Sequence, residues 1–334
     1  MTRRLPTIHL LLFALAVLCP AAPVAAEDKP AYTPSEYKAY LKAHEASGLD
    51  EKEAAVIDFL DWHGKSTLLP NVLYELQVCF EARLKNQETQ RAEETAKRLL
   101  AHYPVARDLA ERVLAKIRLD RGEYGPYLDL AEAIYARNPV PRMAAEMVLI
   151  ADKAKDKARC EKYAALVEQT GSSRETADLF FTLSRNRLEG KDDEGALAWA
   201  RRVAAVLDVP EKPADFTGEW ETYQVQVLNP SLGLMGMACL KAQDYPGAIA
   251  IFDKILAHNP REAVTYYWRA AAHVNRGEPE NALPDFARAA VLKDETVSIK
   301  ALEMVQKILE ARGEDPSGAE AHLDAARTAL GMQE

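Results

Sequence analysis

The sequence has no uninterrupted apolar stretch of the ~18 residues that a membrane-spanning helix needs. Its longest apolar run, residues 10–18, has about half that length and lies near the N-terminus. Cysteine is scarce, with four in 334 residues, and positive charge is not clustered, since lysines and arginines alternate with acids and the net charge is −9. Clustered positive charge is the footprint of a nucleic-acid-binding protein. The sequence therefore predicts no integral membrane span beyond the N-terminal segment and no nucleic-acid partner.

Catalytic and metal-binding motifs are also missing. The histidines after residue 26 are scattered, and none has the His-Glu-x-x-His or another ligand spacing. There is no phosphate-cradling glycine loop, no Gly-x-Ser-x-Gly elbow and no Cys-x-x-Cys-His haem site. We therefore predict no catalytic residue, no metal site and no cofactor, and we expect a protein that is not an enzyme.

The N-terminal segment has the features of an export signal. Arg3 and Arg4 supply the positive start, residues 9–19 are largely apolar, and residues 24–26 are small enough for cleavage after Ala26. We therefore expect a periplasmic or secreted protein that begins at Glu27. A lipid anchor on Cys19 is the less favoured alternative, because bulky Leu18 precedes it where bacterial lipoprotein signals carry a small residue.

Three cysteines remain after this cleavage, and each lies inside an apolar helical pattern. The interpretation that fits an odd number best is that they are small buried hydrophobic residues. A disulfide between two of them stays open as an alternative. The three are Cys79, Cys160 and Cys239.

Between residues 229 and 294, one pattern of apolar and small residues occurs twice. Residues of the same kind recur after 34 positions, and a fixed period of that length predicts stacked structural repeats. The recurring pairs are Leu232 and Tyr266, Gly236 and Ala270, Ala248 and Ala282, and Phe252 and Phe286. Together with Pro260, which closes the first copy, this pattern resembles the tetratricopeptide repeat. The resemblance implies an all-α superhelix in which each unit is a pair of antiparallel helices.

The resemblance also implies a binding face. In tetratricopeptide domains, residues 2, 5, 9, 12 and 13 of the first helix of each pair face the inside of the superhelix. In the two best-matched units this predicts an apolar strip with a polar residue at its edge. The predicted strip consists of Met237, Leu240, Tyr267, Ala271, Val274 and Asn275.

The remaining layout follows from weaker copies of the same pattern. Residues 100–104 recur almost verbatim at 256–260, and residues 33–36 form a capping box that opens the first helix. We expect about eight helix pairs. The expected segments are a signal peptide (1–26), an N-terminal helical cap (27–66), degenerate tetratricopeptide-like pairs (67–176), one such unit (177–208), an aromatic insertion (209–228), two well-matched units (229–296) and a C-terminal capping pair (297–334).

The insertion is recognised by its length. Residues 195–199 match residues 247–251 at an offset of 52, which is one 34-residue period plus 18. Phe216, Trp220 and Tyr223 are its aromatic residues, and residues 223, 225 and 227 alternate as in a short strand. Two alternatives stay open for the three rings: they pack over the neighbouring repeats, or they contact a partner.

We therefore expect a non-catalytic scaffold that binds a protein or an extended peptide on the concave face. The alternative is an accessory of envelope polysaccharide assembly or export. A groove lined by aromatic rings with few charges would favour this alternative, because sugars stack on such rings. A peptidoglycan-acting enzyme is less favoured, because the sequence lacks the Glu-Ser dipeptide of lytic transglycosylase catalytic domains.

Overall fold

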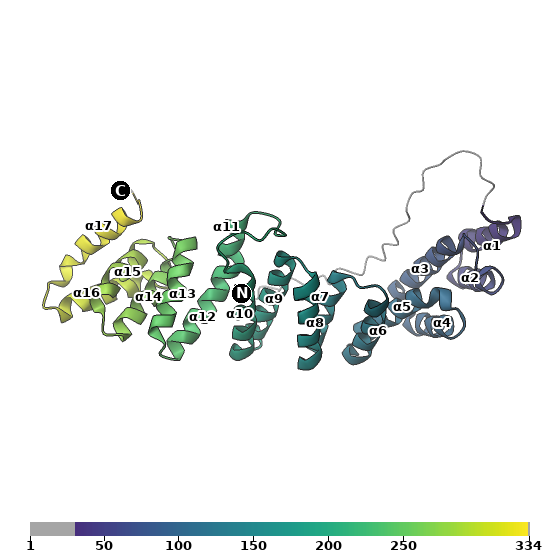
Figure 1. The fold of residues 1–334 in the computed structure, drawn as a ribbon, viewed down its shortest axis with the longest axis horizontal. Helices are drawn as coiled ribbons and strands as arrows, with labels where there is room; N and C mark the ends of the chain where they lie inside the picture. The colour runs from purple at the N-terminus through teal and green to yellow at the C-terminus, as the bar shows by residue number, and fades with distance from the viewer. Residues whose placement is uncertain (1–30, 333–334) are drawn as a thin grey trace. The chain divides into compact units, whose positions relative to one another are not determined.

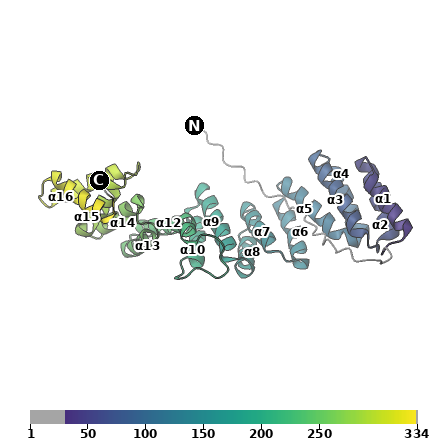
Figure 2. The same ribbon diagram turned by 90° about the horizontal axis from the view of Figure 1, so that it is seen from above.

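The computed structural model describes residues 31–332, where the chain is helical without a β-strand. Successive helices form antiparallel pairs (Figures 1 and 2). They divide into two compact units at Pro139 and Val140. The first unit contains α1 (Pro34–Glu45), α2 (Leu49–His63), α3 (Leu69–Lys85), α4 (Thr89–His102), α5 (Arg107–Asp120) and α6 (Tyr124–Arg137).

The second unit continues the same arrangement. It contains α7 (Pro141–Lys153), α8 (Lys157–Thr170), α9 (Ser173–Glu189), α10 (Asp193–Leu207), α11 (Trp220–Tyr223), α12 (Asn229–Lys241), α13 (Tyr245–His258), α14 (Ala263–Asn275), α15 (Pro279–Val291), α16 (Ser298–Ala311) and α17 (Ala319–Ala329). With the short α11 set apart, the described helices make eight pairs. The all-α class and the number of pairs predicted from the sequence are confirmed. The predicted export signal and Cys19 lie outside the described residues.

Side chains at the helix starts explain where several helices begin. The Thr33 hydroxyl accepts from the Glu36 amide, and the Glu36 carboxylate accepts from the Thr33 amide, which completes the predicted capping box of α1. Asp192 and Asp244, which are 52 residues apart, cap α10 and α13 in the same way through Gly195 and Gly247. Each cap satisfies an amide that the helix itself leaves without a partner.

The turn between the two helices of a pair has one recurring geometry. A single residue adopts positive φ, and the next amide donates to a carbonyl five residues back, as Asp244 does to Cys239 over 2.9 Å. This is the Schellman type of helix end. Glycine occupies the position in three turns and Gln or Lys in four. These residues are Gly122, Gly277, Gly313, Gln87, Lys155, Lys191 and Gln243.

The two helices of a pair approach closely where the repeat carries a small residue. Gly236 of α12 is buried against the ring of Phe252 on α13. At the equivalent place in the preceding pair, the Ser184 hydroxyl donates to the carbonyl of Ala196 over 2.8 Å. Both contacts lie inside a pair, so small residues here set the distance between its helices.

The insertion, whose conformation the sequence left open, forms helix in its second half, although residues 223, 225 and 227 alternate as in a short strand. Gln224–Leu228 form a π-helical turn that joins α11 directly to α12. Tyr223 and Val227 are buried one turn apart, and the Ser231 hydroxyl donates to the Val227 carbonyl over 3.0 Å. A helix satisfies these backbone groups internally, whereas a lone strand would need a neighbouring edge.

Candidate binding surface

The predicted strip lies on the first helices of two neighbouring pairs. Met237 and Leu240 belong to α12, and Tyr267, Ala271 and Val274 belong to α14, where they follow one another at helical spacing. All five are half-buried, and Asn275 at the end of α14 is exposed. Part of each apolar side chain is therefore open to solvent. Its role in binding stays a prediction.

Tyr267 has a structural role in addition to its partial exposure. Its ring centroid lies 5.3 Å from that of Trp268 and 5.5 Å from that of Phe286, edge-on in both cases. Tyr267 and Val274 also pack against the apolar core that α14–α17 share. Replacing Tyr267 would therefore disturb packing as well as any contact with a partner. Met237 is a better probe of the strip because it is not among the residues of that core.

Equivalent positions on α9, which the sequence-based prediction did not include, are also apolar and partly open to solvent. Phe181 and Leu188 precede Gly233 and Leu240 by the same 52 residues that relate the two helix starts. Phe181 is half-buried and Leu188 is 40% exposed. The 52-residue offset between the two repeats could have predicted both residues from the sequence. We call the whole set the repeat strip: Phe181, Leu188, Gly233, Met237, Leu240, Tyr267, Ala271 and Val274.

Charges are few along the repeat strip. Arg185 occupies the α9 position that corresponds to Met237 of α12, and it pairs with Glu189 at 3.9 Å. Lys241 ends α12 and pairs with Asp193 at 3.1 Å. Both cations thus have an acidic partner within this unit, so the strip carries no unbalanced charge of its own.

The three aromatic residues of the insertion are buried. Of the two alternatives, packing over the neighbouring repeats is therefore the one that the structure shows. The Phe216 ring centroid lies 4.9 Å from those of both Trp220 and Tyr223. The guanidinium of Arg174 lies 5.3 Å from the Tyr223 ring centre. The Tyr223 hydroxyl donates to Asp178 over 2.7 Å. These contacts place the aromatic cluster on the start of α9.

Backbone and side-chain hydrogen bonds hold the irregular half of the insertion to the same helix. Ser173 donates to Asp215 from its amide and from its hydroxyl, each over 2.7 Å, and Arg174 donates to the Thr217 carbonyl over 2.8 Å. The Ser173 hydrogen bonds lower the pKa of Asp215. Burial, with Asp178 next to it, raises the pKa of Tyr223. The insertion is therefore an ordered part of this unit.

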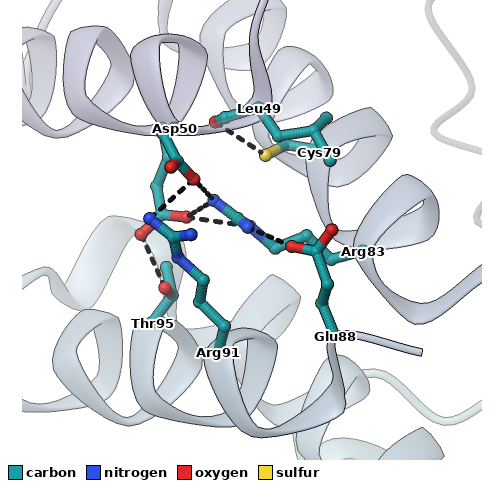
Figure 3. A network of polar contacts seen from close by, with 8 residues as sticks. Leu49, Asp50, Cys79, Arg83, Glu88, Arg91 and Thr95 are labelled. Carbon is teal, nitrogen blue, oxygen red and sulfur yellow. Dashed lines mark hydrogen bonds and ion pairs between the residues drawn. The ribbon is translucent and has the colours of Figure 1, made fainter. Parts of the chain in front are cut away.

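The most concentrated charged cluster is structural (Figure 3). Arg83 of α3 is 1% exposed and donates to Asp50 over 2.7 Å, to Glu53 over 2.8 Å and to Glu88 over 2.6 Å. Burial alone would lower the pKa of Arg83, but these carboxylates raise it. Asp50 and Glu53 belong to α2, and Glu88 directly precedes α4. One permanent cation thus joins three helices.

Related clusters recur along the chain. Arg118 of α5 contacts Glu93 of the preceding pair and Glu123 at the start of its own second helix, and Arg187 of α9 contacts Asp152 and Asp192 in the same way. In each case the cation and acid are five residues apart within the pair. Their regular spacing indicates that they fasten successive pairs together, so none of them marks a catalytic centre.

The titratable groups give no second candidate site. Among the described residues, each carboxyl group whose pKa departs from its ordinary value is lowered, and none is raised as a general acid requires. No three histidine, cysteine or acidic residues in this part of the chain are placed to hold a metal ion.

The three cysteines are free thiols in the described structure. Cys79 and Cys160 are buried and Cys239 is half-buried. Burial raises the pKa of all three, that of Cys160 to about 11. A raised pKa keeps a thiol protonated and unreactive.

The structure thus defines a class of protein. Antiparallel helix pairs, a 34-residue period and a small residue at the contact within a pair make up a tetratricopeptide-type helical repeat fold. Within residues 31–332, no helix is both long and apolar enough to cross a membrane.

Comparison with known proteins gives likenesses of fold. No protein-family model and no curated protein matches the chain. A tetratricopeptide repeat protein from Parabacteroides merdae is 12% identical, with 83% of this chain and 100% of that chain covered and a TM-score of 0.36. MamA of AMB-1 is 18% identical, with coverages of 59% and 97% and a TM-score of 0.35. Yeast Tom70 is 11% identical, with coverages of 85% and 66% and a TM-score of 0.36.

Proposed function

We propose that the protein is a non-catalytic scaffold that binds another protein or an extended peptide through the repeat strip. The supporting observation is that equivalent positions of α9, α12 and α14 keep apolar side chains partly open to solvent. Exposed apolar surface is costly in water, and contiguous patches on soluble proteins mark interaction sites. The matching positions in three helices would let one extended apolar segment contact several repeats at once.

Capture of a partner with matched variants tests the proposal. Met237→Lys and Leu188→Lys place a charge in the strip, whereas Val140→Lys places one at a similarly exposed apolar residue outside it. The protein captured from envelope extracts by the wild type should be lost with both strip variants and retained with the control. Each variant is first checked for an unchanged thermal midpoint. Retention by both strip variants would exclude the strip as the binding surface.

The location is part of the proposal. Residues 1–26 are proposed to direct export and to be removed, which leaves a periplasmic or secreted protein that starts at Glu27. Mass spectrometry of the exported chain should give this N-terminus. A lipid on Cys19 or an intact signal in the membrane fraction would contradict it.

One observation favours a second candidate, an accessory of envelope polysaccharide assembly or export. From Tyr32, just before α1, the rings of Tyr37, Tyr40 and His44 follow along the helix with successive centroids 5.5, 6.3 and 5.6 Å apart. Tyr37 and, on α3, Tyr74 are exposed. Titration calorimetry with envelope oligosaccharides should then give a heat that Tyr37→Ala and Tyr74→Ala abolish and Met237→Lys preserves.

A further inference from the structure

We draw no further inference here: the strongest candidate, the apolar groove between α15, α16 and α17 at the C-terminal end of the second unit, carries no proposal because nothing in the structure shows what covers it.

Discussion

A Cβ atom on Gly236 would lie 2.6 Å from Cε1 of the Phe252 ring, closer than side chains approach one another in folded proteins. Gly233, one turn earlier on the same helix, has nothing within 4 Å of that position. The two glycines of α12 therefore have different roles. Gly236 makes the contact with the second helix possible, and Gly233 lies in the repeat strip.

We expect Gly236→Ala to lower the free energy of unfolding by about 1 to 3 kcal/mol, because the added methyl group must displace a packed ring. Gly233→Ala should raise it by roughly 0.5 to 1 kcal/mol, since alanine favours helix over glycine. Urea denaturation measures both. An unchanged midpoint for Gly236→Ala would argue against the aligned repeat.

Glu93 should make part of the stability acid-sensitive. Its hydrogen bonds with Lys97 and Arg121 lower its pKa from 4.5 to about 2. A carboxyl group with a lowered pKa contributes stability above the unfolded-state value, and that contribution is lost as pH falls toward the folded-state value. The difference in unfolding free energy between wild type and Glu93→Gln should therefore be full at pH 7 and shrink between about pH 4.5 and 2.

The neighbouring residue provides the control for this experiment. Glu94 is exposed, and Gln90 donates to it over 3.0 Å. Glu94→Gln should give a small difference at every pH. A Glu93→Gln difference that does not change with pH would show that its ion pairs contribute nothing to stability.

The aromatic cluster of the insertion should matter for folding. Trp220 is buried against Phe216, so Trp220→Ala should cost about 3 to 5 kcal/mol, as loss of a large buried ring does. Trp62→Ala, at a largely exposed ring, should cost less than about 0.5 kcal/mol. Equal midpoints for the two variants in thermal melting would mean that the insertion does not stabilise the second unit.

The cysteines should differ in their reaction with iodoacetamide. Cys239 is half-buried, whereas Cys79 and Cys160 are buried. At pH 8 we expect Cys239 to be alkylated first and slowly, because burial raises its pKa too. Cys79 and Cys160 should react only after denaturation. Peptide mass spectrometry at successive times checks the order, and early labelling of Cys160 would contradict the packing of α8.

The repeat strip should not bind acidic C-terminal tails. Tetratricopeptide domains that grip such tails resemble one another in having lysine, asparagine or arginine at the fifth and ninth residues of the first helix. The corresponding residues here are Gly233 and Met237 in one unit and Tyr267 and Ala271 in the next. Titration calorimetry with an acidic tail peptide should give no binding heat, and a measurable affinity would disprove the assignment of the strip.

Features that depend on nearby residues could be predicted from the sequence. The capping box at Thr33 and the small residue at Gly236 follow from local chemistry and from the 34-residue period. The predicted strip followed from the resemblance of residues 229–294 to the tetratricopeptide repeat.

Features that depend on distant residues could not be predicted. Tyr223 of the insertion is buried where Arg174 and Asp178, more than forty residues earlier, accept its hydrogen bonds. Arg83 is buried only because acids from two other helices converge on it. Lys191 and Gln243 adopt positive φ, which their residue types do not suggest.

Each helix packs mainly against its neighbours in sequence, and this influences the order in which the helix pairs fold. The close contacts of α12 are with α10 and α13, and those of α14 are with α13 and α15. Contacts this local need little loop closure, so a pair can form soon after its own residues have been synthesised. Each completed pair then offers a template for the next one. Apart from the aromatic cluster that residues 216–223 complete on α9, the helix pairs can therefore assemble progressively from the N-terminal end of the chain.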